Sequence, residues 1–178
     1  MGVIRQSFPI RAPAAHAFDV GTNLHLFRSF IPFLKDVRAS DARIDHVGVA
    51  YTLVFGLLGL RFRTPSWRIE EVRPANLADA SRPDPPWEIV ETGLLPGSRA
   101  VRMRSTTRYE AVGQSSIASH VVTFELPGGR IGGVLDRFIV NPLVRLAMGI
   151  IGRRFARHAE SPSSQGRIDP PGARVGPP

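Results

Sequence analysis

The most restrictive feature of this sequence is the strict alternation of side chains from position 101 to position 110. Successive side chains of a strand point to opposite faces, so one set must lie inward and the other in solvent. The expected inward set is Val101, Met103, Ser105, Thr107 and Tyr109, and the expected solvent set is Arg102, Arg104, Thr106, Arg108 and Glu110. A second alternation, at His120, Val122, Phe124 and Leu126, follows the turn residues Gly113 and Gln114. We therefore expect two adjacent strands of a half-buried sheet, with His120 on the inner side.

One long helix is expected after the glycines at 128 and 129, over residues 136–160. Pro142 either begins this helix behind Asn141 or kinks it after a first turn. The apolar stretch from 138 to 151 is shorter than the roughly 20 residues that span a bilayer, so we expect no transmembrane helix. The apolar positions of the helix are Phe138, Ile139, Leu143, Leu146, Ala147, Ile150, Ile151 and Phe155.

The remaining elements complete an α+β architecture. Two short helices are predicted at 13–20 and 24–34, the second broken at Pro32, and residues 74–86 have the composition of a loop. The strands are predicted at 3–10, 37–44, 47–57, 60–72, 87–94, 99–112 and 116–126, with a bulge or edge irregularity at Pro65. The expected fold is a curved antiparallel sheet of about six to seven strands wrapped on the long C-terminal helix.

Composition limits the chain to one domain. With 178 residues and 43% hydrophobic content it can bury one substantial core, which we assign to residues 1–160. Residues 161–178 are rich in Pro, Gly, Ser and Arg, which predicts a disordered tail. The chain contains no cysteine, which excludes a disulfide framework and a cysteine nucleophile. Its first residues lack the pattern of a signal peptide, so we expect a cytoplasmic protein.

The formal net charge is +8, and Lys35 is the single lysine among 23 basic residues. The arginines are scattered along the chain instead of being clustered with aromatic residues, which favours a solvated basic surface. We do not expect nucleic acid as a partner. The alternative, a basic surface that docks on nucleic acid or the ribosome, would require steep salt dependence of binding.

Several short sequence segments resemble those of a known family. The segment from Ile10 to Asp19, Ile-Arg-Ala-Pro-Ala-Ala-His-Ala-Phe-Asp, is similar to the opening of polyketide cyclase/dehydrase proteins in the START-like (SRPBCC) superfamily. The residues from Phe30 to Leu34, the entry His46-Val47-Gly48 and the segment 133–160 resemble later elements of that family in the same order. The resemblance implies a helix-grip fold with a cavity for a hydrophobic molecule, and catalysis in some members.

The inward residues predict either a solid core or a ligand cavity, and the resemblance implies a cavity. Small residues that would leave volume inside include Ser105, Thr107 and Ala147. The predicted cavity residues are Phe30, Tyr51, Phe55, Trp67, Met103, Ser105, Thr107, Tyr109, His120, Val122, Phe138, Ala147 and Ile151.

The candidate catalytic residues are His120 and Tyr109. An imidazole with a pKa near 6.5 suits proton transfer at neutral pH, but no second inward acid or base is identifiable in the neighbouring strands, which favours a hydrogen-bonded lining role for His120. A tyrosine hydroxyl could orient a ligand carbonyl or only complete the core. The histidines do not fall at paired ligand spacing, so neither a metal nor a cofactor is expected.

The segment 54–60 is apolar on both faces, which the exposed tip of a hairpin should avoid. We expect Phe55, Leu57, Leu58 and Leu60 to be covered by the domain itself, by a second copy in a homodimer, or by transient contact with a membrane. The function that the resemblance implies is binding or transport of a small hydrophobic molecule such as a lipid, a quinone or a polyketide. The alternative is an aromatase/cyclase or dehydratase enzyme that uses the cavity His or Tyr.

Overall fold

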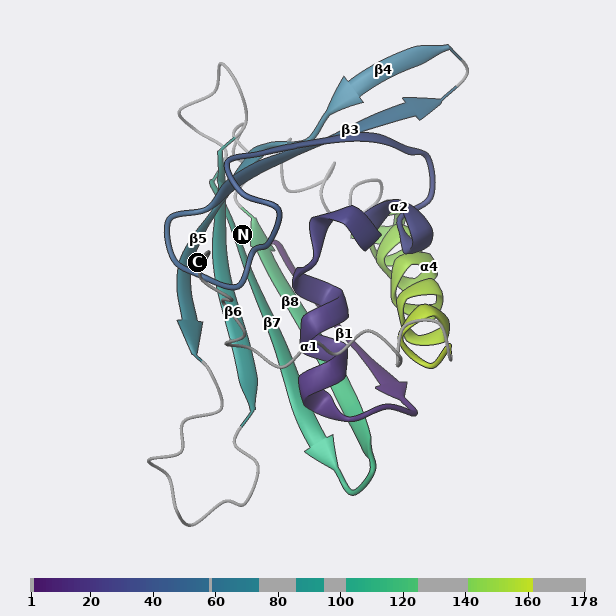
Figure 1. The fold of residues 1–178 in the computed structure, drawn as a ribbon. Helices are drawn as coiled ribbons and strands as arrows, with labels where there is room; N and C mark the ends of the chain where they lie inside the picture. Colours follow the sequence, from purple (N-terminus) through teal and green to yellow (C-terminus); the bar gives the residue numbers. More distant parts are fainter. Residues whose placement is uncertain (1, 58, 74–85, 95–101, 125–140, 162–178) are drawn as a thin grey trace, which may run out of the picture.

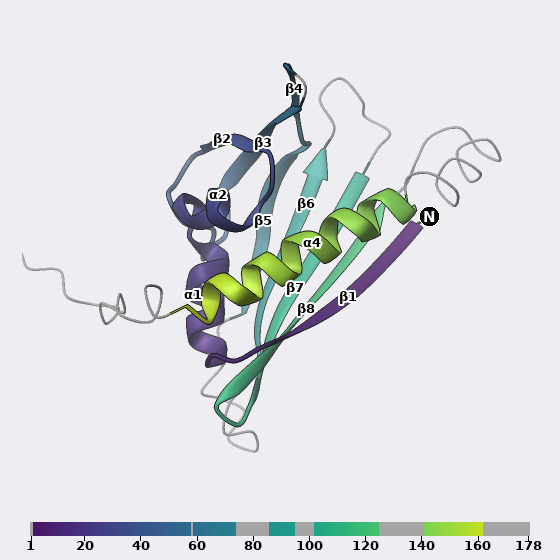
Figure 2. The same cartoon turned by 90° about the vertical axis from the view of Figure 1, so that its right-hand side faces the viewer.

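The architecture is an antiparallel sheet curved around a long helix. A computed structural model describes residues 2–57, 59–73, 86–94, 102–124 and 141–161. Over these residues the strands follow the order β1-β8-β7-β6-β5-β3-β2, and β4 pairs with β3 beyond this path. Figure 1 shows the sheet edge-on, and Figure 2 shows helix α4 lying across its concave face. The predicted α+β helix-grip fold is confirmed.

The bounds of the elements follow the alternation in the sequence. The strands are β1 (Gly2–Ile10), β2 (Leu34–Ala39), β3 (Ala50–Leu57), β4 (Leu60–Arg63), β5 (Ser66–Arg73), β6 (Trp87–Leu94), β7 (Arg102–Val112) and β8 (Ser115–Phe124). The helices are α1 (Ala14–Thr22), the 3-10 turn η1 (Leu24–Leu26), α2 (Phe27–Phe30) and α4 (Asn141–Ala159). Gly59 and Gly113 have positive φ in the tight β3–β4 and β7–β8 turns, a conformation that glycine adopts at little cost.

Two corrections concern the first half of the sheet. The second strand is Leu34–Ala39 and not 37–44, because residues 40–49 form a loop held by backbone bonds, among them Ile44 N–H to the Thr22 carbonyl at 2.9 Å. The predicted strand 60–72 is divided into β4 and β5 at Thr64 and Pro65. Thr64 N–H still bonds to the Leu53 carbonyl at 2.9 Å, so the break is the local irregularity expected at the proline.

Helix α4 is attached to the N-terminal elements at both of its ends. Gln6 on β1 donates from Nε2 to the Arg145 carbonyl at 2.7 Å. At the other end, His16 Nε2 on α1 lies 3.1 Å from the carbonyl oxygen of Ala159, and the Arg11 amide donates to Glu160 at 2.9 Å. Within the described residues, no helix is long and apolar enough to cross a membrane. Residues 136–140 of the predicted helix and 162–178 of the predicted tail lie outside the described residues.

The main core lies where α1 and α2 pack against the sheet and the end of α4. Its buried residues include Phe18, Phe27, Phe30 and Phe155. Phe30 packs edge-on against Phe155, with ring centroids 5.3 Å apart. This core closes one end of the space between α4 and the sheet.

Candidate functional site: a cavity between the sheet and helix α4

A cavity of about 340 Å³ lies between the concave face of the sheet and α4. This volume falls at the lower end of the range for small-molecule sites. Helix α4 contributes one stripe, Val144, Met148, Ile151, Gly152 and Phe155. The other lining residues are Phe8, Gly21, Phe27, Phe30, Ile31, Ile44, Tyr51, Leu53, Thr64, Pro65, Trp67, Ile89, Glu91, Met103, Ser105, Thr107, Tyr109, Ala118, His120 and Val122.

The structure brings most of the predicted cavity residues around this one space. The group that lines it comprises Phe30, Tyr51, Trp67, Met103, Ser105, Thr107, Tyr109, His120, Val122 and Ile151. The odd positions of β7 contribute four of these residues, as expected from the alternation that starts at position 101. Their role in binding a ligand is taken up below as a proposal.

Three predicted residues do not contribute to the described cavity. Phe55 follows Tyr51 and Leu53 on β3, but its ring stacks on that of Phe62 on β4, with ring centroids 5.5 Å apart. The β3–β4 hairpin projects from the body of the sheet (Figure 1). Ala147 is exposed, because it lies roughly a quarter of a turn from the centre of the α4 stripe. Phe138 lies outside the described residues.

A buried carboxyl group, Glu91 on β6, interrupts the apolar wall. It is only 8% exposed, and Tyr51 Oη donates a hydrogen bond to its Oε2 at 2.6 Å. The Ser105 side chain, directly opposite Glu91 in the β6–β7 register, also bonds to the carboxyl group. Burial raises the pKa of Glu91 above its usual range, although these two hydrogen bonds oppose the rise. Glu91 is therefore an ionisable side chain in the wall of the cavity.

His120 on β8 continues the same polar chain. Its Nδ1 lies 2.8 Å from Thr107 Oγ1, its cross-strand partner, and its Nε2 lies 3.4 Å from Ser105 Oγ. Burial lowers the pKa of His120 to about 4, so the imidazole is neutral at pH 7. Its hydrogen bonds to two hydroxyl groups suit a neutral ring, which has one donor and one acceptor.

The sequence analysis did not identify Glu91. The alternation that indicated the inward face of β7 also exists in β6, where Trp87 and Ile89 precede Glu91 at every second position. Ile89 lines the cavity, so Glu91 two residues later must face the same way. Glu91 was not assigned to the inward face because glutamate side chains are seldom buried.

Tyr109 has a hydroxyl group that makes no hydrogen bond within the described part of the chain. The residue is only 4% exposed, and its ring packs against Phe18 and Phe155 with centroids 6.0 and 6.2 Å away. The hydroxyl lies against Gly21 of α1, so close that a Cβ at position 21 would overlap it. Burial raises the pKa of Tyr109 above its usual range, so the hydroxyl keeps its proton.

Trp67 on β5 forms part of the wall by lying over a glycine. Gly93 is its cross-strand partner on β6, and a Cβ on Gly93 would come within 3.0 to 3.2 Å of the indole ring. The Trp67 indole can pack this closely against the sheet because Gly93 has no side chain.

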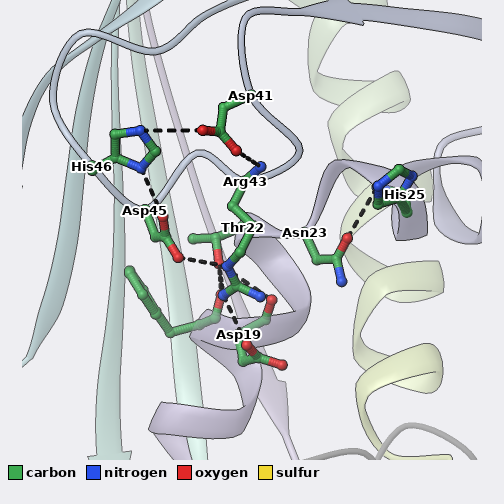
Figure 3. Close-up of polar contacts among 9 residues, drawn as sticks. Asp19, Thr22, Asn23, His25, Asp41, Arg43, Asp45 and His46 are labelled. Atoms are coloured by element: carbon green, nitrogen blue, oxygen red, sulfur yellow. Dashed lines mark hydrogen bonds and ion pairs between the residues drawn. The ribbon is translucent and has the colours of Figure 1, made fainter. Parts of the chain in front are cut away.

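A polar cluster attaches the loop 40–49 to helix α1 (Figure 3). Arg43 donates from Nη2 to Asp19 Oδ1 at 2.8 Å and to Thr22 Oγ1 at 3.0 Å, and from Nε to Asp45 at 2.5 Å. His46 Nδ1 lies 3.0 Å from the other oxygen of Asp45. Burial opposes the charge of Arg43, but the bonds to Asp45 and Asp19 raise its pKa above the ordinary value. This cluster holds Ile44, the next residue, against the cavity.

Within the described ranges, no three His, Asp or Glu side chains are grouped as a metal site would require.

Comparison with solved structures places this architecture among known folds. A protein from Thermus thermophilus is 14% identical with a TM-score of 0.65, covering 89% of this chain and 97% of its own. The Zhui aromatase/cyclase from Streptomyces sp. R1128 is 13% identical with a TM-score of 0.62, covering 89% and 93%. Major latex-like protein 151 from Panax ginseng is 10% identical with a TM-score of 0.60, covering 90% and 98%.

No protein-family model matches the sequence, and no curated protein matches it. The solved structures establish the fold: the chain has the START-like (SRPBCC) helix-grip fold. The resemblance read from the sequence is thereby confirmed at the level of the fold. Neighbours with this fold include both a polyketide aromatase/cyclase and a plant major latex-like protein.

Proposed function

We propose that the protein binds one small hydrophobic molecule, such as a lipid, a quinone or a polyketide, between the sheet and α4. The observation that carries the proposal is the cavity of about 340 Å³, whose wall is mostly apolar. Burial of apolar ligand surface supplies about 25 cal/mol per Å² before the costs of binding are subtracted. A solid core would have filled this volume with side chains.

Native mass spectrometry of the freshly purified protein, compared with extraction after denaturation, tests this function. We expect an apolar molecule in one-to-one ratio. The variant Ile151→Trp should lose it, because Ile151 lines the cavity, whereas Ile150→Trp should retain it, because the neighbouring side chain is not part of the lining. Equal retention in both variants, or a protein that neither copurifies with nor binds apolar molecules, would reject the function.

An enzyme of the aromatase/cyclase or dehydratase kind is the second candidate. The observation in its favour is that Glu91 and His120, both able to exchange protons, are joined through Ser105 inside the cavity. One neighbour with this fold is an aromatase/cyclase. The expected result for His120→Ala is loss of turnover of a polyketone substrate with binding largely retained. Unchanged turnover would exclude His120 as the acid or base.

We also propose that the β3–β4 hairpin touches an anionic membrane during ligand exchange. Leu60 is 73% and Phe62 51% exposed, and the exposed Arg61 and Arg63 alternate with them on β4. Figure 1 shows this hairpin projecting from the body of the sheet. Apolar side chains beside arginines suit the boundary between acyl chains and anionic head groups. The side chains of Leu57 and Leu58 lie outside the described residues.

Co-sedimentation with vesicles tests the membrane contact. Binding is expected to vesicles with anionic lipid and to weaken in the double variant Leu60→Ser, Phe62→Ser. The control is Val112→Ser, since Val112 is 53% exposed at the β7–β8 turn and not on this hairpin. If the double variant instead abolishes a concentration-dependent dimer in sedimentation analysis, the hairpin is a homodimer contact and the membrane proposal fails.

A further inference from the structure

Two features of the cavity are not explained by hydrophobic binding alone. The Tyr109 hydroxyl has no hydrogen-bond partner among the described residues, and the described wall contains no lysine or arginine. We propose that Tyr109 donates a hydrogen bond to a neutral oxygen of the ligand, so that the site takes ketones, aldehydes or quinones and rejects carboxylates. This inference rests on the proposed function, because it requires that the cavity holds a ligand.

The hydroxyl of Tyr109 is a donor at the edge of the cavity. It lines the cavity and has no hydrogen-bond partner among the described residues, although the residue is only 4% exposed. A ligand acceptor that enters the cavity gives this hydroxyl a hydrogen bond, which a hydrocarbon of the same shape cannot do. The raised pKa of Tyr109 keeps the proton available for donation.

The position of this donor is fixed before any ligand arrives. The Tyr109 ring packs edge-on against Phe18 on one element and against Phe155 on another. The close approach of the hydroxyl to Gly21 limits its movement toward α1. A donor that is already held in place loses little freedom when it binds, which favours one preferred orientation of the ligand.

Tyr51, the other tyrosine, differs in this respect. Its hydroxyl proton already serves the 2.6 Å hydrogen bond to Glu91. Glu91 also takes the bond from Ser105. The chain from Tyr51 through Glu91 to His120 is thus internally satisfied, and Tyr109 remains the donor that a ligand can use. The two tyrosines form a natural matched pair for mutation.

The charge of the wall excludes anions. The described lining contains neither lysine nor arginine, although the whole chain has 23 such residues. His120 is neutral at pH 7 because burial lowers its pKa to about 4. A ligand carboxylate would therefore be desolvated without a cation, in a wall that already contains the Glu91 carboxyl group. A carbonyl oxygen carries no such cost.

Three naphthalene compounds test the inference by calorimetric titration at pH 7.5: 2-acetylnaphthalene, 2-ethylnaphthalene and 2-naphthoate. The wild-type protein should bind the ketone roughly 2- to 12-fold more tightly than the hydrocarbon, the gain of one neutral hydrogen bond, and 2-naphthoate least tightly. Tyr109→Phe should remove the ketone preference and leave the hydrocarbon affinity unchanged. Tyr51→Phe should retain the preference.

The outcomes of this titration distinguish failure of the Tyr109 inference from failure of the proposed function. If the hydrocarbon binds but 2-naphthoate equals the ketone, or if Tyr109→Phe keeps the ketone preference, the inference is wrong and the proposed function stands. If none of the three compounds binds and no apolar molecule copurifies, the proposed function fails and the inference with it. The hydrocarbon affinity of Tyr109→Phe shows in the same experiment whether that variant is folded.

Discussion

Tyr51 and Glu91, 40 residues apart in the chain, are joined inside the cavity by a hydrogen bond of 2.6 Å. The bond links β3 to β6, which are separated in the sheet by β5. It therefore spans the curvature of the sheet at the level of the cavity and ties the stability of the fold to the ionisation of Glu91.

Replacing Tyr51 with phenylalanine should lower the free energy of unfolding by about 1–3 kcal/mol, because Glu91 loses a buried donor. The folded-state pKa of Glu91 is raised, so its contribution to stability is complete below the ordinary value of 4.5 and is lost as the pH rises. The variant raises this pKa further, so its deficit should grow as the pH rises above 4.5. Urea denaturation at pH 5 and at pH 8 measures this deficit, and in a Glu91→Gln background the pH dependence of the deficit should vanish.

Acid should destabilise the protein through His120. Its pKa falls from 6.5 in the unfolded chain to about 4 in the folded state, so only the unfolded chain takes up the proton between these values. The free energy of unfolding should fall by up to about 1.4 kcal/mol per pH unit as the pH drops through this window. The variant His120→Gln should lack this component. Parallel urea titrations from pH 7.5 to 4 give the difference, and identical slopes would contradict a His120 that stays neutral in the folded protein.

Two glycines of α4 should respond in opposite ways to alanine. A Cβ on Gly149 would meet its nearest atom at 3.7 Å, so Gly149→Ala should stabilise by about 1 kcal/mol through helix propensity. A Cβ on Gly152 would overlap the Phe8 ring, and overpacking costs about 1–3 kcal/mol, which outweighs the same gain. Thermal denaturation compares the two variants. Adding Phe8→Leu should rescue Gly152→Ala if the overlap is the cause.

Removing the guanidinium of Arg43 should loosen the loop 40–49. Arg43→Met breaks the bonds to Asp19, Thr22 and Asp45. Both ion pairs are partly exposed, so the loss of stability should be about 1 kcal/mol or less. The amide of Ile44, bonded to the Thr22 carbonyl, should exchange its hydrogen faster. Arg38→Met is the control, because Arg38 makes only an exposed ion pair of 3.6 Å with Asp36. Equal exchange rates in both variants would contradict the tethering role.

Much of the fold could be predicted because one face of each strand is apolar and the other is polar. The inward positions of β7 and β8, including Ser105 and His120, follow from alternation alone. The second strand was misplaced because Ile44 is buried and apolar without being in a strand. Its burial depends on the tertiary contacts of the loop with α1, and local periodicity contains no information about these.

The candidate site was predicted less completely than the fold. Periodicity indicates which side chains face inward, but not which hydrogen bonds they form, so the different roles of Tyr51 and Tyr109 could not be derived. Glu91 was missed because residue type was given more weight than position, although Ile89 defined its face. The space itself depends on how far α4 stands from the sheet, which is a property of the whole packing.

Trp67 and Trp87 are the two tryptophans of the chain, and they lie in different surroundings. Trp67 lines the cavity, whereas Trp87 packs against Phe18 with ring centroids 4.5 Å apart and is not part of the lining. Indole emission responds to the polarity of its environment and to nearby quenchers. In a Trp87→Phe variant, the remaining fluorescence would come from Trp67 in the cavity wall alone. The emission of this variant would therefore report whether the cavity is occupied.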